Sequence, residues 1–199
     1  MPETRDLPQS DFCECLQLTN HLDVVEWMFE PGMLFQSSAT WWGDRGNRLR
    51  PHEGLDLRLF RTSANRVASL PPGSLIPALY NGEVVRIIND FLGRTIFVRH
   101  RQHGSAGRDL YTVYGHVEPR AALSAGVFVN GGEGIAHLAT RGKGETGPPP
   151  HLHLTASWIT LEVDALQLDW KLMGRQKEVS LVDPLSLIGC RYALLHRQI

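Results

Sequence analysis

The chain lacks a strong net charge and any long apolar run. Its 199 residues carry 20 basic and 21 acidic side chains, a formal net charge of −1. This balance gives no electrostatic reason to expect nucleic acid or an anionic membrane surface as a partner. No apolar run approaches the roughly 20 residues that cross a bilayer, so we expect no membrane span. The first six residues show no basic head followed by an apolar stretch, so no signal peptide is visible. The sequence therefore predicts either an intracellular protein or the trimmed form of an exported one.

Cysteine is scarce as well. The three cysteines are Cys13, Cys15 and Cys190, so they cannot all pair within one chain. Cys13 and Cys15 are separated by one residue, whereas thiolate zinc sites usually begin with two to four intervening residues. We expect at most one long-range disulfide and no thiolate zinc site.

The composition predicts one soluble globular domain. Apolar residues make up 42% of the chain and charged residues 21%, and 199 residues suffice for one core. Residues 1–42 have an irregular pattern, with a helix-compatible piece at 22–29 and the start of a long loop at 37–50. We therefore predict an N-terminal extension over residues 1–42 and the main domain over residues 43–199.

From residue 75 the pattern changes to short strands separated by glycine. Asn81-Gly82 between the apolar segments 76–80 and 83–88 predicts a hairpin, because this dipeptide suits a two-residue turn. Further strands are predicted at 95–100, 110–114 and 152–159, while residues 162–182 fit either a helix or another hairpin. The expected fold is mainly β, an antiparallel sheet or barrel-like sandwich with few short helices.

Two histidines lie near the start of the strand predicted at 152–159. His151 and His153 are separated by one residue, and alternate side chains on a strand point to the same face. Both imidazoles would then enter one cavity, although two surface histidines on an edge strand would give the same pattern.

His52 and Asp56 are four residues apart, with Gly54 between them. On a straight strand they would lie about 13 Å apart, too far to share an ion. Pro51 and Gly54 argue against a helix, so a bend at Gly54 is needed to bring the two side chains together. The alternative is a solvated loop, and neighbouring Glu53 is interpreted as a solvated side chain.

His52, Asp56 and His153 together match a catalytic zinc site. Such a site takes three protein ligands and leaves the fourth position open. His116, which follows the strand predicted at 110–114, and His151 would remain for proton transfer. A lone histidine such as His116 is otherwise more often structural.

This set of residues resembles the lysostaphin-type (LytM-domain) zinc metallopeptidases, a family of peptidoglycan endopeptidases. Their His-x-Gly-x-Asp element corresponds to residues 52–56, and their Tyr-x-His element to residues 114–116. Their Gly-Pro-His-Leu-His element corresponds to residues 147–153, with two extra prolines. The resemblance spans roughly residues 43–188. Residues 58–74 and 155–182 are longer than the family's links and are expected to reshape the groove.

The resemblance implies a Zn²⁺ held by His52, Asp56 and His153, with His116 and His151 as catalytic imidazoles. It also implies an antiparallel β-fold with a groove, and a peptide substrate from peptidoglycan or another peptide rich in glycine or alanine. The expected reaction is peptide hydrolysis by zinc-activated water. Which histidine acts as the base, and the oligomeric state, are not indicated.

Two alternatives to an active enzyme remain. One is a non-catalytic module of the same fold that binds or activates cell-wall hydrolases. The other is a latent site closed by the N-terminal segment, with Asn20, Asn47 or the Trp41-Trp42 pair as the plug. The remaining histidines, at positions 21, 100, 103, 137 and 196, are interpreted as structural or solvated.

Overall fold

The structure is a computed structural model that describes residues 7–44, 46–90, 93–105, 107–140 and 147–195. Within these ranges it contains one α-helix, α1 (Phe12–Thr19), and four 3₁₀ turns, η1 (Pro31–Met33), η2 (Ala165–Gln167), η3 (Leu172–Gly174) and η4 (Pro184–Ser186). The strands are β1 (Glu26–Phe29), β2 (Leu55–Leu57), β3 (Leu59–Arg61), β4 (Val67–Ser69), β5 (Leu75–Pro77), β6 (Gly82–Asn89), β7 (Arg94–Ser105), β8 (Arg108–Pro119), β9 (Phe128–Val129), β10 (Gly134–Leu138), β11 (Leu152–Thr160), β12 (Val179–Val182) and β13 (Tyr192–Leu194). The mainly β prediction is confirmed.

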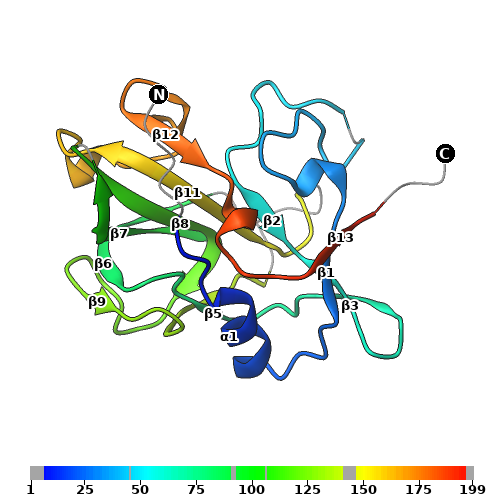
Figure 1. Cartoon of the computed structure of the whole chain (residues 1–199). Coiled ribbons are helices and arrows are strands. Elements are labelled where there is room, and N and C mark those ends of the chain that lie inside the picture. The colour runs from blue at the N-terminus through cyan, green and yellow to red at the C-terminus, as the bar shows by residue number, and fades with distance from the viewer. Residues whose placement is uncertain (1–6, 45, 91–92, 106, 141–146, 196–199) are drawn as a thin grey trace.

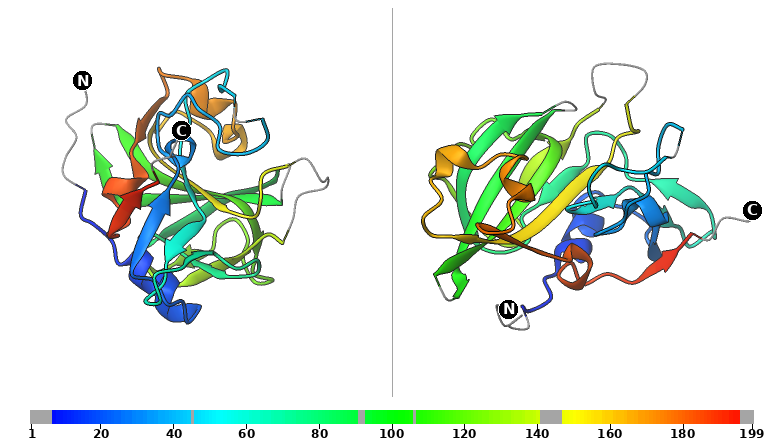
Figure 2. Two further views of the ribbon diagram at one scale, coloured as in Figure 1. Left: turned by 90° about the vertical axis from the view of Figure 1, so that its right-hand side faces the viewer. Right: turned by 90° about the horizontal axis from the view of Figure 1, so that it is seen from above.

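The larger sheet carries the long strands and runs in the order β12-β11-β8-β7-β6-β9, with antiparallel neighbours (Figure 1). β2 pairs with β11, and β10 connects β5 to β8. In the view from above, β11 runs diagonally between the central strands of this sheet and the segment that contains β2 (Figure 2). β11 therefore pairs both with β8 of the central sheet and with β2.

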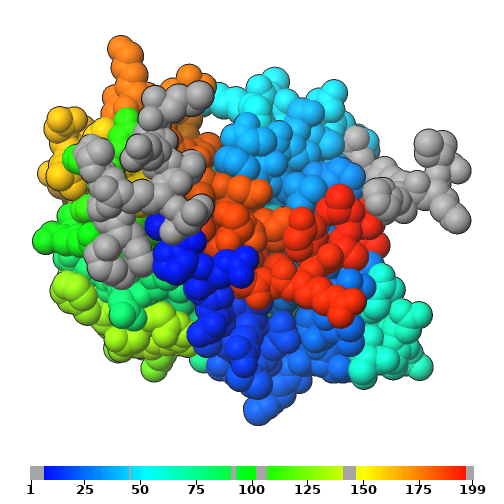
Figure 3. Space-filling model, viewed as in Figure 1, coloured from blue at the N-terminus to red at the C-terminus, as the bar shows by residue number. Residues whose placement is uncertain are grey.

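The smaller sheet runs in the order β13-β1-β3-β4, and its β1–β13 pair is parallel. The N-terminal and C-terminal segments lie side by side on one face of the molecule (Figure 3), where the backbone N–H of Ser10 donates to the carbonyl of Leu187 at 2.8 Å. β1, from the N-terminal region, therefore pairs with two strands from later in the chain, β3 and β13. The domain boundary after residue 42 stays a prediction.

Apolar side chains cover both faces of the larger sheet. On β8, Tyr114 packs into the main core, while the adjacent Val113 packs into a second cluster with Phe97 and Ile159. Leu172 and Met173 of the segment after β11 close this second cluster. Alternation along the strands therefore explains why residues 161–178 fold back over the sheet.

Two local predictions are wrong. Residues 26–29 form β1 rather than a helix, because burial of three successive side chains, Trp27 to Phe29, favours pairing with β3. Asn81-Gly82 does not close a hairpin, since β5 pairs with β10 and β6 pairs with β7 and β9. For residues 162–182, where the sequence leaves a helix or another hairpin open, the structure has turns and 3₁₀ helices up to residue 178 and then β12, which pairs antiparallel with β11.

All three cysteines are free thiols. In the described part of the chain, no helix is long and apolar enough to cross a membrane.

Candidate metal centre and active site

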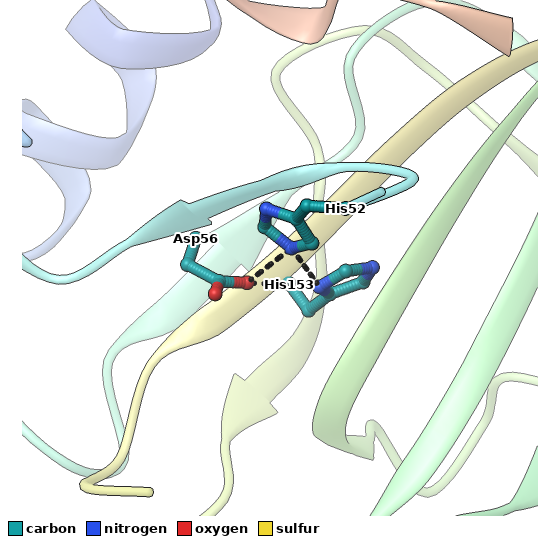
Figure 4. Close-up of side chains that lie close together, drawn as sticks. All are labelled: His52, Asp56 and His153. Carbon is teal, nitrogen blue, oxygen red and sulfur yellow. Dashed lines mark hydrogen bonds and ion pairs between the residues drawn. The ribbon is translucent and has the colours of Figure 1, made fainter. Parts of the chain in front are cut away.

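His52, Asp56 and His153 converge on one point between β2 and β11 (Figure 4). His52 Nε2 lies 3.2 Å from both His153 Nδ1 and Asp56 Oδ1. His153 Nδ1 lies 2.8 Å from the same Asp56 oxygen. All three side chains are buried. The structure therefore brings together the three residues that the sequence singles out, and their role as ligands stays a prediction.

A bend at Gly54 makes this convergence possible. His52 precedes the bend, β2 starts directly after it, and Asp56 pairs in register with His153 of β11. A Cβ at Gly54 would lie 2.5 Å from the carbonyl oxygen of Leu154 and 2.7 Å from Thr155 Oγ1. Only glycine allows this close approach of the bend to β11.

Contacts at the outer nitrogen of each ring orient the two histidines. His52 Nδ1 lies 3.0 Å from the carbonyl oxygen of Leu34, which can only accept, so Nδ1 carries the proton. His153 Nε2 lies 3.1 Å from Thr155 Oγ1 and 3.8 Å from Glu53 Oε1, which favours a proton on Nε2. Each ring therefore turns an unprotonated nitrogen toward the shared point, as outer contacts of metal-binding histidines do.

The geometry fits a tetrahedral zinc ion. Ligand bonds of about 2.0–2.1 Å place two ligand atoms about 3.3 Å apart, close to the 2.8–3.2 Å found here. Two nitrogen lone pairs and a carboxylate facing one another in a buried site repel unless a cation lies between them. Burial alone would raise the pKa of Asp56, but His151 and His52 outweigh it and hold this pKa well below its usual range.

His151 and His116 border this point. The two rings have centroids 4.8 Å apart, and His151 Nε2 lies 3.6 Å from Asp56 Oδ1. His151 Nδ1 donates to the carbonyl of Pro149 at 2.8 Å, which leaves Nε2 facing the site. Burial lowers the pKa of His151 to about 4. This ring is therefore neutral near pH 7, with a free lone pair.

His116 lies within β8 in the left-handed region, at φ 64°, which is uncommon for a residue other than glycine. Asp90 holds it there. Asp90 Oδ2 accepts from the backbone N–H of His116 at 3.1 Å and lies 3.3 Å from His116 Nδ1. Burial would raise the pKa of Asp90, but contact with His116 outweighs burial and keeps the pKa below its usual range.

Asp90 is a site residue that the sequence did not reveal. The hydroxyl of Thr95 donates to Asp90 Oδ2 at 2.8 Å, and the indole N–H of Trp170 donates to Thr95 Oγ1 at 3.2 Å. The Trp170 ring also contacts His153, with centroids 5.0 Å apart. An aspartate at the end of a strand and a tryptophan in an irregular segment carry no local signal of such roles.

A pocket of about 350 Å³ opens over the histidines. Its walls include Trp42 and Arg48 on the N-terminal side, Glu53 beside the bend, and Trp170. Glu53 thus lines the pocket rather than pointing only into solvent. The segment expected to be a loop, 37–50, forms one wall, and the segment after β11 contributes to the other.

None of the three suggested plugs supplies a fourth ligand. Asn20 joins α1 to β5 through hydrogen bonds to Leu16 and Leu75. Asn47 lies in an isolated bridge with Ala39. Trp41 does reach the site, where its indole N–H donates to Asp56 Oδ2 at 2.6 Å, but an indole N–H only donates and is not a metal ligand.

Among the other histidines, His100 is buried between the carbonyl of Asn81 and the hydroxyl of Thr112, which is a structural position. His137 is exposed and contacts the carbonyl of Gly73. His21 lies at a turn with positive φ, 52°. The side chain of His103 and the whole of His196 lie outside the described residues.

The chain is similar to one family of known proteins. The model of peptidase family M23 matches residues 50–165, more than half of the chain. No curated protein matches the chain.

Solved structures similar to the chain include LytU (22% identity, TM-score 0.45, covering 76% of this chain and 78% of that one). The catalytic domain of the antimicrobial peptidase lysostaphin from Staphylococcus simulans has 17% identity and a TM-score of 0.42, covering 68% and 77%. A mutant catalytic domain of the prophage-encoded M23 protein EnpA from Enterococcus faecalis has 24% identity and a TM-score of 0.39, covering 59% and 78%.

Proposed function

This chain belongs to peptidase family M23, and from that premise we propose that it is a zinc-dependent endopeptidase acting on peptidoglycan peptides. One observation carries the zinc assignment. Two imidazole nitrogens and one carboxylate oxygen, each oriented by a second contact, lie 2.8–3.2 Å apart in a buried site. His52, Asp56 and His153 would hold the ion.

When bound, zinc supplies Lewis acidity, which polarises a carbonyl and lowers the pKa of a water molecule to about 7. The remaining chemistry belongs to the two other histidines. The Nδ1 atoms of the two rings have different partners, which are the carbonyl of Pro149 for His151 and the Asp90 carboxylate for His116.

We assign proton acceptance to His151. Its Nδ1–H is engaged by Pro149, and its buried ring is neutral near pH 7, so Nε2 can take a proton from water. His116 receives the opposite role, because the Asp90 carboxylate 3.3 Å from its Nδ1 orients the ring at the edge of the pocket. His116 Nε2–H would then donate to the developing oxyanion or to the leaving amine.

The pocket supports a peptide substrate in an extended conformation. Four of the five site residues, Asp56, His116, His151 and His153, line it, and the aromatic rings of Trp42 and Trp170 flank them. Peptidoglycan cross-bridges and other peptides rich in glycine or alanine have small side chains that fit between such walls. Their cleavage follows from the family resemblance of residues 52–56, 114–116 and 147–153.

The test measures zinc content and hydrolysis together. Wild-type protein and the variants His153→Ala, His116→Ala and His137→Ala are incubated with purified peptidoglycan and with glycine- and alanine-rich peptides, and the products are identified by mass spectrometry. His153→Ala should lose most of its zinc. His116→Ala should keep zinc but turn over about 100- to 10,000-fold more slowly. His137→Ala, an exposed histidine outside the pocket, should behave like the wild type.

Each contrary result rejects a separate part of the proposal. Undiminished zinc in His153→Ala rejects the ligand assignment, and wild-type turnover in His116→Ala excludes this residue from the chemistry. A zinc-loaded wild type that binds these substrates without cleaving them would instead identify a non-catalytic binding module.

A further inference from the structure

The two carboxylate oxygens of Asp56 have different partners. Oδ1 faces His52 and His153, whereas Oδ2 accepts the indole N–H of Trp41 at 2.6 Å and lies 3.6 Å from Arg48 Nη2. Trp41 and Arg48 belong to residues 37–44 and 46–50, which we name the strap. We propose that the strap is a positioning element: it engages one carboxylate oxygen of Asp56, so that only the other oxygen is available to bind the metal. This proposal rests on the proposed zinc site.

Trp41 is built into this contact. Its side chain is 3% exposed, and its ring packs edge-on against Trp42 and His151, with centroids 5.5 and 5.1 Å away. Its only polar atom is a donor. Since Trp41 packs against Trp42 on one side and His151 on the other, its N–H is held toward Asp56 Oδ2.

Arg48 fixes the strap and adds charge at the same oxygen. Its Nε donates to the carbonyl of Ala39 at 3.1 Å, and its Nη2 donates to the carbonyl of Gly32 at 2.9 Å. Its guanidinium carbon lies 4.8 Å from the centre of the Trp42 ring. A guanidinium remains charged at any physiological pH. The positive charge is therefore permanent, and its distance from Asp56 is set by the strap backbone.

The consequence concerns the coordination of the ion. A carboxylate with both oxygens free can bind a cation through one oxygen or through two. With Oδ2 engaged by Trp41 and Arg48, Asp56 would contribute one ligand atom to a bound zinc ion, which suits a site with three protein ligands. Except for residue 50, the strap lies outside the residues that the family model matches. The positioning function is therefore carried by this chain's own N-terminal segment.

The experiment compares metal binding in Trp41→Phe, Arg48→Met and a control, Trp27→Phe. Trp41→Phe keeps an aromatic ring and removes the N–H. Trp27→Phe makes the same chemical change in β1, where the buried indole N–H has no hydrogen-bond partner among the described residues. Zinc affinity is measured by competition with a chromophoric chelator, and the Co²⁺-loaded proteins are compared by visible absorption. Folding of each metal-free variant is checked by circular dichroism.

Trp41→Phe should bind zinc about 10- to 100-fold more weakly than the wild type. Its Co²⁺ spectrum should lose intensity, because a carboxylate that binds through two oxygens raises the coordination number above four. Arg48→Met should weaken binding in the same direction and provides a second test if Trp41→Phe does not fold. Trp27→Phe should match the wild type in affinity and spectrum.

Zinc affinity in both strap variants within twofold of the wild type, with an unchanged Co²⁺ spectrum, would overturn the positioning role. That outcome differs from failure of the zinc site itself. In the latter case the wild type and His153→Ala would bind zinc equally weakly, whatever residue stands at position 41.

Discussion

Adding one methyl group at Gly54 tests whether the bend between His52 and Asp56 forms the site. In Gly54→Ala the new Cβ would lie 2.5 Å from the carbonyl oxygen of Leu154 and 2.9 Å from His153 Nε2. Ordinary contacts begin near 3.4 Å, so the bend must move away from β11 by about 0.9 Å. Metal sites tolerate ligand displacements of about 0.2 Å. The required movement is several times larger.

We therefore expect a selective loss of function. Crowding of this kind costs about 1–3 kcal/mol of unfolding free energy, which leaves most of the protein folded. Zinc affinity should fall by at least about tenfold, and turnover by about 100-fold, the effect typical of a 1 Å displacement. Zinc affinity is measured by chelator competition, turnover on purified peptidoglycan, and stability by thermal unfolding of the metal-free protein.

Gly46→Ala is the matched control. Gly46 lies in the strap, and a Cβ there would meet no heavy atom within 4 Å. This variant should retain wild-type zinc affinity and turnover, with a stability change below about 1 kcal/mol. If Gly54→Ala also binds zinc and turns over like the wild type, the close approach of the bend to β11 does not define the site, and the reasoning is refuted.

The candidate site is predictable from sequence where short-range geometry decides it. The period of two along a strand places His151 and His153 on one face, and both rings do border the same point. The excluded straight-strand and helical paths leave a bend at Gly54 for His52 and Asp56, and the bend is present. In both cases, steric rules that involve only a few neighbouring residues were sufficient to predict the arrangement.

The supporting contacts were not predictable, because they join positions distant in sequence. Asp90 contacts His116 across 26 residues, and Trp41 reaches Asp56 from outside β2. Nothing in the local pattern distinguishes Asp90 from a solvated aspartate at a strand end. Its role arises from the pairing of β6 with β7 and of β7 with β8, which brings residues 90, 95 and 116 together.

The errors in the fold have the same origin. Residues 22–29 fit a helix in isolation, but Trp27 and Phe29 gain complete burial by pairing β1 with β3 and β13. Asn81-Gly82 is typical of a two-residue hairpin turn, but no hairpin forms there. Instead, the side-chain amide oxygen of Asn81 accepts a hydrogen bond from the backbone N–H of Gly131. Long-range strand pairing outweighed local preference in both places.

Three further predictions address the metal and the catalytic groups. Removal of metal by a chelator should abolish hydrolysis and lower the unfolding temperature, and added zinc should restore both; activity that survives chelation would contradict a metal requirement. His151→Ala should keep its zinc and lose about 100- to 10,000-fold in turnover, measured on the same peptides. In metal-free protein, Asp90→Asn should lower the unfolding free energy at pH 7 by about 1.5–3 kcal/mol, since charged hydrogen bonds are lost at a side chain that is 1% exposed. The pKa of Asp90 is lowered in the folded protein, because burial is outweighed by contact with His116. Its carboxylate therefore contributes fully to the unfolding free energy above the unfolded-state pKa of about 4, and this contribution is lost as the pH falls through the folded-state pKa. Denaturant unfolding from pH 6 to pH 2 should therefore show the difference between wild type and variant shrinking below about pH 4, and a constant difference would show that the charge of Asp90 does not support His116.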